Sequence, residues 1–249
     1  MPKPLTQDEL VTMRKAGVVA SAILKKIGRF VKPGVTTKEI EFFFDRELAK
    51  HKGMAAAFKG FMGYPASCCI SVNEEVIHGI PCENRVLENG DLVSVDIGIE
   101  YKGLFVDTAC TYGVGKLAGK ARQLRETTLC SLNKGIKAAR AGATIGDIGF
   151  AVQDTVERKG FSVIRRFVGH GIGRSLHLPP EVPNFGQKHQ GEKLLEGYAI
   201  AIEPMVCEGG FDVEILEDGW TARTKDGLLS AHFEHTVAVT KKGPWVLTQ

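Results

Sequence analysis

Hydrophobic residues alternate with polar or small residues along two consecutive stretches of the chain. The first covers residues 90–99 and the second residues 104–109, with the turn signal Glu100-Tyr101-Lys102-Gly103 between them. Alternation with a period of two is typical of strands that bury one face, so the pattern predicts a β-hairpin. With the turn centred between its second and third residues, Asp96 and Asp107 become direct cross-strand neighbours on the face opposite the aliphatic one.

Two carboxylates paired in this way would repel each other. Directly opposed residues on one face of an antiparallel pair have Cβ atoms about 4.5–5.5 Å apart, where like charges are unfavourable. The flanking aliphatic positions predict buried strands, so both anions would be partly desolvated and would need a positive partner. A bound metal ion meets that need. On this hairpin alone, two aspartates on a solvated strand face are nearly as good an interpretation.

The chain contains a second copy of the segment that precedes this hairpin. Residues 33–40 and residues 141–148 each predict the start of an amphipathic helix with a Thr cap. The first helix is expected to end near Lys52-Gly53 and the second near Lys159-Gly160. The copies therefore agree in their helix caps and in their helix ends.

A second acid-bearing hairpin follows the second helix at the same distance. Residues 197–204 repeat the alternation of the first strand, with Glu203 in the place of Asp96. The later alternating stretch, residues 231–239, carries Glu234 as the counterpart of Asp107. The interval between these two glutamates is longer than in the first copy and contains the hairpin signals Asp-Gly twice.

Agreement of caps, helix ends, strands and acids makes chance similarity a poor explanation. We predict an α+β fold in which antiparallel sheets are covered by helices, with an internal pseudo-two-fold repeat. The expected organisation is one domain over residues 1–249, with repeats of approximately 5–118 and 119–249. Packing the two hairpins together would bring all four acids to the centre of this domain.

One histidine between the two hairpins completes a set of candidate metal ligands. His170 lies in the glycine-rich stretch 169–173, which leaves its imidazole uncrowded. A lone histidine is more often an ordinary core or surface residue, but four central carboxylates make it a natural nitrogen ligand. The five candidates are Asp96, Asp107, His170, Glu203 and Glu234. Four carboxylates suit two divalent ions (Co, Mn, Fe or Zn), a pair that can align a nucleophile and a carbonyl for hydrolysis.

Composition narrows the remaining classes of function. The chain is 43% hydrophobic and 24% charged, as in ordinary globular proteins. A net charge of +3 and short, dispersed basic pairs such as Arg165-Arg166 do not predict nucleic-acid binding unless the pairs converge in space. No apolar run could cross a membrane and the N-terminal segment lacks the apolar core of a signal peptide, so we expect a cytoplasmic protein. No H-E-x-x-H, phosphate-loop or G-x-S-x-G motif competes with the metal site.

The five candidate ligands, their spacing, and His177 shortly after the glycine-rich stretch resemble methionine aminopeptidases of the short bacterial type I, in peptidase family M24. The resemblance extends over essentially the whole chain, and the short interval between His170 and Glu203 lacks the long insertion typical of type II. Residues 73–81 also resemble the family segment that carries a second catalytic histidine, here His78. The resemblance implies the pita-bread fold, a dinuclear metal site, and removal of the initiator methionine when the second residue is small.

The same resemblance implies roles for individual residues. Asp96 and Asp107 would bridge or chelate the metals, and Glu203 would also take a proton from the attacking water. His78 would contact the scissile amide nitrogen, and His177 would stabilise the developing oxyanion. Besides these histidines, the methionine pocket would be lined by Phe61, Tyr64, Cys69, Met205 and Trp220. From sequence alone, ordinary core packing explains these five side chains nearly as well.

Two positions depart from the family pattern and affect the shape of this pocket. Phe58 stands where members often carry Cys, and Leu176 stands where they often carry Phe. Neither position belongs to the metal site. The departures therefore concern the substrate pocket alone.

The implied partners are the N-termini of nascent polypeptides, with the ribosome as a second candidate and a monomer as the expected state. No membrane and no specific nucleic acid is expected. Two other functions stay open. An X-Pro aminopeptidase or prolidase-like hydrolase would share the fold, but such proteins usually carry a further N-terminal domain, for which residues 1–30 leave no room. A non-catalytic pita-bread binding protein would be expected to have lost ligands, whereas all five are present.

Overall fold

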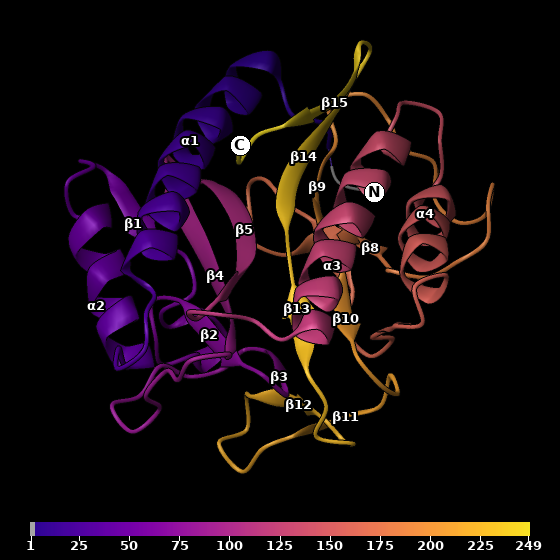
Figure 1. The fold of residues 1–249 in the computed structure, drawn as a ribbon. Helices are drawn as coiled ribbons and strands as arrows, with labels where there is room; N and C mark the ends of the chain where they lie inside the picture. The colour runs from indigo at the N-terminus through magenta and orange to yellow at the C-terminus, as the bar shows by residue number, and fades with distance from the viewer. Residues whose placement is uncertain (1–2) are drawn as a thin grey trace.

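Four α-helices form two pairs, one from each half of the chain, in the computed structural model, which describes residues 3–249. They are α1 (Gln7–Phe30), α2 (Thr37–Leu48), α3 (Gly119–Ala138) and α4 (Ile145–Glu157). α1 packs against α2 and α3 against α4, and both pairs lie over the same side of the strands (Figure 1). The predicted caps are Thr36 and Thr144, each forming a capping box. Both repeated helices end a few residues before the predicted Lys-Gly pairs.

Antiparallel strands make up the rest of the regular structure. The first half contributes β1 (Met54–Ala56), β2 (Cys69–Val72), β3 (Glu75–Ile77), β4 (Leu92–Tyr101) and β5 (Leu104–Gly113), with a short 3-10 helix, η1 (Phe61–Gly63). The second half contributes β6 (Ser162–Val163), β7 (Gly169–Gly171), β8 (Leu178–Val182), β9 (Ala199–Ile202), β10 (Met205–Cys207), β11 (Val213–Ile215), β12 (Ala222–Thr224), β13 (Ser230–His232), β14 (His235–Thr240) and β15 (Gly243–Val246).

The strands form four sheets. Their orders are β1-β4-β2 with β5 beside β4, β13-β10-β6, β11-β12-β3, and β15-β14-β9-β7-β8. Every strand pair in these sheets is antiparallel. The predicted α+β class, with antiparallel sheets covered by helices, is confirmed.

The first acid-bearing hairpin consists of β4 and β5, but its predicted register is wrong. Asp96 pairs with Ala109 and Asp107 with Gly98, so the aspartates are diagonal neighbours and not directly opposed. The turn is formed by Lys102-Gly103, whose φ angles of 55° and 73° belong to a two-residue hairpin turn with positive φ at both positions. The turn therefore centres one residue later than predicted. Because this moves each pairing by two positions, every side chain keeps its predicted face.

The two faces of this hairpin have different surroundings. Tyr112, which pairs with Val93 on the aliphatic face, donates a hydrogen bond from its hydroxyl to the carbonyl of Leu24 in α1, at 2.7 Å. This face is therefore covered by helix. The opposite face carries Asp96 and Asp107, whose side chains border a cavity.

The second acid-bearing hairpin is interrupted at both of its acids. Residues 203–204 separate β9 from β10, and residues 233–234 separate β13 from β14. The pairings on either side of these breaks share one register, which places Glu203 opposite Glu234. Pro204 has no N–H and cannot continue the ladder of β9. The direct opposition predicted for the aspartates therefore occurs in the second copy.

Threonine side chains join the two hairpins at the middle of the molecule. The hydroxyl of Thr236 accepts a hydrogen bond from the N–H of Asp107, at 2.9 Å, and donates to the Asp107 carbonyl, at 2.8 Å. Thr111 makes the same two bonds with the backbone of His232, at 2.9 and 2.7 Å. These bonds hold β5 beside β13 and β14, so the acids of both hairpins meet at one centre.

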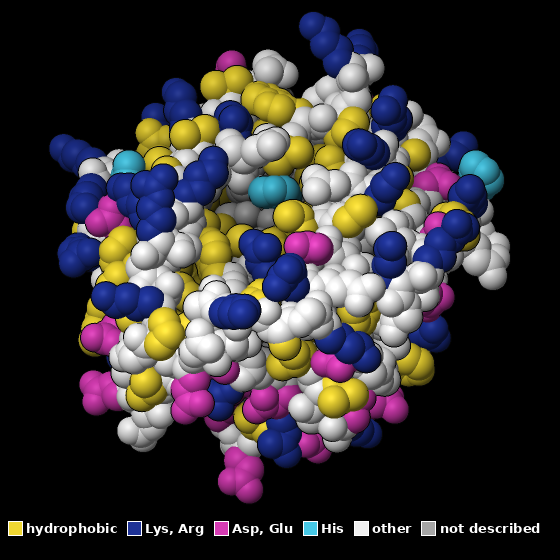
Figure 2. All heavy atoms as spheres, viewed as in Figure 1, with side chains coloured by type: hydrophobic (Ala, Val, Ile, Leu, Met, Phe, Trp, Pro, Cys, Tyr) yellow, Lys and Arg dark blue, Asp and Glu magenta, His cyan; other side chains and the backbone are white. Residues whose placement is uncertain are grey.

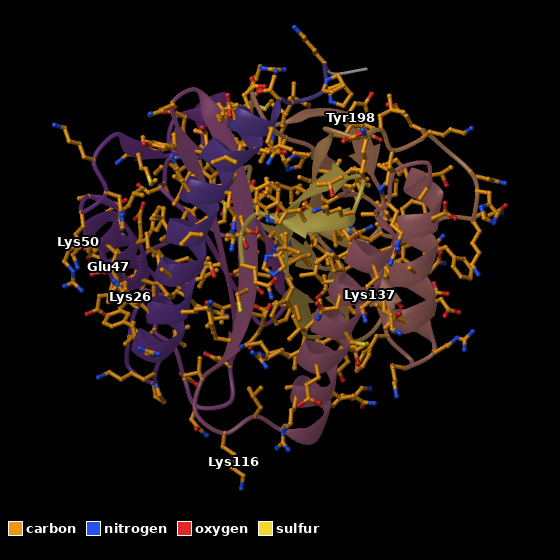
Figure 3. The ribbon with its side chains drawn as sticks, turned by 90° about the horizontal axis from the view of Figure 1, so that it is seen from above. Lys26, Glu47, Lys50, Lys116, Lys137 and Tyr198 are labelled. Atoms are coloured by element: carbon orange, nitrogen blue, oxygen red, sulfur yellow. The ribbon has the colours of Figure 1, made fainter. Side chains whose placement is uncertain are left out.

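Further contacts hold the helical layer together. In α1, Lys26 forms an ion pair of 2.7 Å with Glu47 of α2, and Lys50 contacts the same carboxylate (Figure 3). The C-terminal segment crosses α1 at Gly17, where an added Cβ would lie 2.0 Å from the carbonyl oxygen of Leu247.

Figure 2 shows that the side of the molecule seen in Figure 1 carries interspersed basic and acidic side chains with small separate hydrophobic areas. None of the helices in residues 3–249 is long and apolar enough to cross a membrane.

Candidate metal centre and substrate cavity

The five predicted metal ligands lie together at the junction of the two hairpins. One oxygen each of Asp96, Asp107 and Glu234 lie within 4.8 Å of one another, and atoms of His170, Glu203 and Glu234 form a second such group. Asp96 and Asp107 come from β4 and β5, whereas the glutamates come from the breaks in the second hairpin. The structure therefore brings all five side chains to one site, although they are spread over more than half of the sequence.

Several carboxylate oxygens at this centre are buried without a hydrogen-bond partner. They are Asp96 Oδ1, Asp107 Oδ1 and Glu234 Oε1, none of which has a partner within residues 3–249. Burial raises the pKa of Asp107 to about 7 and raises the pKa of Asp96, Glu203 and Glu234 well above the usual range, with repulsion from neighbouring carboxylates adding to the effect at these three. Oxygen atoms that are close together, buried and unpaired form a donor set that fits divalent cations.

His170 has the tautomer that a metal ligand requires. Its Nδ1 lies 2.9 Å from the carbonyl oxygen of Gly171, which can only accept, so Nδ1 carries the proton. The Nε2 lone pair is then free, and this atom lies 3.5 Å from Oε1 of Glu203. Burial lowers the pKa of His170 to about 3, so the imidazole is neutral at physiological pH. A backbone carbonyl that fixes the protonated nitrogen is a common support for metal-binding histidines.

His232 is a residue of this site that the sequence analysis did not single out. It is buried, and its Nε2 has no hydrogen-bond partner among residues 3–249. Nε2 lies 3.8 Å from Oε2 of Glu203. The two oxygens of this carboxylate therefore face different histidines, Oε1 facing His170 and Oε2 facing His232. Burial lowers the pKa of His232 to about 3. A signal was available, because His232 precedes Glu234 by two residues in an alternating stretch and so belongs to the same face.

The two predicted catalytic histidines flank the metal centre. His78 follows β3 with a φ of 60°, which is uncommon for a residue other than glycine, and its ring packs against Phe167 at 5.7 Å. Burial lowers its pKa to about 4. The ring of His177 lies 4.2 Å from that of His170 and 5.1 Å from that of Phe61. A nitrogen of His177 is also within 4.8 Å of donor atoms of Asp107 and His170, so its position is compatible with a ligand as well.

A cavity of about 610 Å³ opens onto these residues. Four of the predicted apolar pocket residues, Phe61, Tyr64, Cys69 and Trp220, line it together with both histidines. Met205, the fifth of these predicted residues, is fully buried in a core cluster that includes Val76 and Ala222, and it is not among the residues that line the cavity. Met205 opens β10 directly after the break at Pro204, and its side chain packs into the core.

Two contacts shape the apolar wall. The rings of Tyr64 and Trp220 meet edge to face at 5.1 Å, while the Tyr64 hydroxyl donates to the carbonyl of Gly79 at 3.0 Å. Phe58, one of the departures from the family pattern, lies against Gly98, where an added Cβ would be 2.5 Å from its ring. Both Phe58 and Leu176 are buried and line the cavity. The Phe58 ring thus uses space that is open only because position 98 is glycine.

Further residues line the cavity beyond those that were predicted. They are Met62, Ile77, Arg166, Phe167, Val168, Gly169, Leu178, Pro179 and Glu181. Several of them flank β7 or belong to β8, and the pairing of β7 with β8 brings them to one wall. No spacing in the sequence marks these positions, because the wall exists only after these strands have paired.

Comparisons with known proteins agree with this arrangement. The model of metallopeptidase family M24 matches residues 11–241. A methionine aminopeptidase of Clostridium perfringens is 47% identical over 242 residues, which cover 97% of this chain and 96% of that protein. The crystal structure of methionine aminopeptidase from Thermotoga maritima matches with a TM-score of 0.98 at 43% identity, and both chains are fully covered. Xaa-Pro dipeptidase from Bacillus anthracis shares the pita-bread fold, with a TM-score of 0.77 at 23% identity, and this chain covers 62% of it.

Proposed function

The chain belongs to metallopeptidase family M24, and on this premise we propose that it is a metal-dependent methionine aminopeptidase. It removes the N-terminal initiator methionine from polypeptides whose second residue is small. The observation that carries this proposal is the convergence of four carboxylates and a neutral imidazole at the floor of an apolar cavity. Relatives named methionine aminopeptidase that match nearly the whole chain support it.

We assign the metal site to Asp96, Asp107, His170, Glu203 and Glu234, with two divalent cations chosen from Co, Mn, Fe or Zn. The unpaired buried oxygens of this set support the assignment, because cations would satisfy them and remove the repulsion between neighbouring carboxylates. When bound, such cations polarise the scissile carbonyl and lower the pKa of the attacking water.

The chain's own side chains move the protons and position the peptide. Glu203 accepts a proton from the attacking water. Its carboxylate lies between the neutral imidazoles of His170 and His232, and this position favours the role. To His78, whose ring packs against Phe167, we assign the contact with the scissile amide nitrogen. His177 supplies an N–H toward the oxygen on which negative charge develops. Both histidines are neutral at physiological pH, because burial lowers their pKa.

The shape of the cavity supports the choice of substrate. Tyr64, Cys69 and Trp220 form an apolar wall that suits the thioether of methionine. We infer that the peptide passes between His78 and His177, which both line the cavity, as its first carbonyl reaches the metal centre, and that the second side chain has little room there. Small second residues are therefore accepted and bulky ones are rejected.

The remaining features of the proposal follow from this activity. The substrates are the N-termini of nascent chains, so we place the protein in the cytoplasm, with the ribosome as a candidate partner. We further propose that the chain acts as one catalytic domain, which contains every ligand and histidine assigned above, and that it acts as a monomer.

A competition assay tests the function. Metal-free protein is supplied with Co²⁺, Mn²⁺, Fe²⁺ or Zn²⁺, and kcat/KM is measured on Met-Ala-Ser, Met-Lys-Ser and Ala-Pro peptides. We expect metal-dependent cleavage of Met-Ala-Ser, with norleucine replacing methionine at a modest loss. Discrimination against Met-Lys-Ser should exceed the 10- to 200-fold that a single methylene provides. Equal processing of both Met peptides, or faster cleavage of Ala-Pro, would transfer the assignment to an X-Pro hydrolase, and no turnover with any metal would indicate a binding protein.

A further inference from the structure

The basic pair Arg165-Arg166 is divided between two different surroundings. The Arg165 guanidinium lies over the rings of Phe211, at 4.5 Å, and Phe185, at 5.5 Å, neither of which lines the substrate cavity. Arg166 borders the cavity. Of these two adjacent arginines, Arg166 lies at the cavity wall and Arg165 lies outside it, so Arg165 can serve as a matched control.

Arg166 is the one Lys or Arg on the cavity wall formed by residues 3–249, and it has no acidic partner there. Its side chain is exposed, and its guanidinium lies over the ring of Phe167, at 5.8 Å. No carboxylate of residues 3–249 lies within 4 Å of its guanidinium, whereas Arg158, Arg174 and Arg223 each have such a partner. Arg166 is thus a free cation at the edge of the substrate site.

The distance of this cation from the reacting bond can be bounded through Phe167. The ring of Phe167 lies 5.7 Å from that of His78, and the Arg166 guanidinium lies 5.8 Å from the same ring of Phe167. These two contacts together span at most about three residues of extended peptide, at roughly 3.4 Å per residue. With His78 at the scissile amide, the guanidinium lies within reach of the substrate side chains that follow the second residue.

We propose that Arg166 binds an acidic side chain at the third or fourth position of the substrate, and so favours N-termini with Asp or Glu there. The inference rests on the proposed function, because it takes the peptide direction from the position of His78. Arginine suits this role, since its planar guanidinium presents paired donors to a carboxylate. The substrate carboxylate would supply the partner that the chain itself does not.

One opposing charge must be included in this picture. Glu181, on β8 opposite His170, is the one acidic residue of the described chain, 3–249, that lines the cavity outside the proposed ligand set. It is exposed and forms no ion pair with Arg166. The rim therefore carries one positive and one negative group, and Glu181 is expected to weaken the preference for acidic substrates without cancelling it.

The test uses amidated tetrapeptides, so that no terminal carboxylate interferes. We compare kcat/KM for Met-Ala-Glu-Ala and Met-Ala-Ala-Glu with their Gln counterparts, using the metal-loaded enzyme. For wild type we expect a Glu to Gln ratio of about threefold at one of the two positions, in the range of exposed ion pairs. The ratio should fall toward one at high ionic strength, because salt screens exposed charges.

Variants assign the effect to one arginine. Arg166→Gln should reduce the ratio to about one, Arg166→Glu should invert it, and Glu181→Gln should increase it. Arg165→Gln should leave both the ratio and the turnover of neutral peptides unchanged. A wild-type ratio near one at both positions, a ratio that survives in Arg166→Gln, or an equal loss in Arg165→Gln would overturn the proposal. Failure to cleave even the Gln peptides would instead overturn the proposed function.

Discussion

Glu203 and Glu234 lie directly opposite each other at a shared break in two paired strands. At this break the backbone of each residue has a partner outside the hairpin. The carbonyl of Glu203 accepts a hydrogen bond from the side-chain amide of Asn184, at 3.0 Å, and the N–H of Glu234 donates to the carbonyl of Ala109, at 3.0 Å. The second hairpin thus loses ladder bonds at its acids but keeps their backbone satisfied, which fixes both carboxylates over the first hairpin.

Glu203→Gln should abolish turnover while the fold survives. The change removes the proposed general base together with one anion of the metal site, and a general base typically contributes 10²- to 10⁴-fold. The measurement is kcat on Met-Ala-Ser at saturating metal, with the unfolding midpoint recorded in parallel. Glu208→Gln, at a partly exposed glutamate paired with Lys120, is the matched control. More than a tenth of wild-type kcat in Glu203→Gln would contradict the assigned role.

His78→Ala and His177→Ala should each lower kcat by 10²- to 10³-fold, because each removes a donor that acts on developing charge. Metal content should stay at the wild-type level in both variants. This is decisive for His177, since a nitrogen of this residue lies within 4.8 Å of donor atoms of Asp107 and His170. Elemental analysis of the purified variants provides the check, with the exposed His189→Ala as control. Loss of a full metal equivalent would make that histidine a ligand.

Asp107→Asn should stabilise the metal-free protein at neutral pH and have little effect near pH 4. Burial raises the pKa of Asp107 from 3.8 to about 7, so the folded state holds a proton that the unfolded state releases. At pH values below about 4, Asp107 is protonated in both the folded and the unfolded protein, so burying it no longer lowers the free energy of unfolding. Between pH values of about 4 and 7 the stability of the wild type falls as the pH rises, by up to about 1.4 kcal/mol per unit.

Denaturant unfolding of both proteins in chelator, across this pH range, checks the prediction. The buried histidines titrate in wild type and variant alike, so the difference between the two curves reports Asp107 together with its effect on Asp96, Glu203 and Glu234, whose pKa values it raises. Added divalent metal should reverse the order, because it stabilises only the protein that retains the full ligand set. A difference that does not change with pH would contradict the proposed burial cost.

Gly98→Ala should destabilise the protein by about 1–3 kcal/mol, because the new methyl group would lie 2.5 Å from the ring of Phe58. Phe58→Cys removes that ring, so the double variant should be more stable than the sum of the single effects implies, by at least about 1 kcal/mol. A double-mutant cycle of unfolding free energies measures this coupling. Gly119→Ala, where an added Cβ meets nothing within 4 Å, is the control. Additive effects of the two substitutions would show that the Phe58 ring does not cause the loss of stability in Gly98→Ala.

Local patterns in the sequence determined much of the fold. Alternation along β4 and β5 assigned Asp96 and Asp107 to one face, because the period of two depends only on backbone geometry. Thr36 and Thr144 were recognisable as helix caps, because a capping box is formed within four residues. The repeated spacing of acids identified Glu203 as a site residue, since the two halves of the chain fold in the same way.

Only the tertiary structure decided which atoms meet. The register of β4 and β5 depends on the turn at Lys102-Gly103, and a centre displaced by one residue still satisfies the same alternation. Met205 is packed into the core, and Arg166 reaches the cavity only after β7 has paired with β8. His232 becomes a neighbour of Glu203 through the pairing of two broken strands. Period and capping are local properties that a sequence carries by itself, whereas register, burial and proximity depend on long-range packing and exist only in the folded chain.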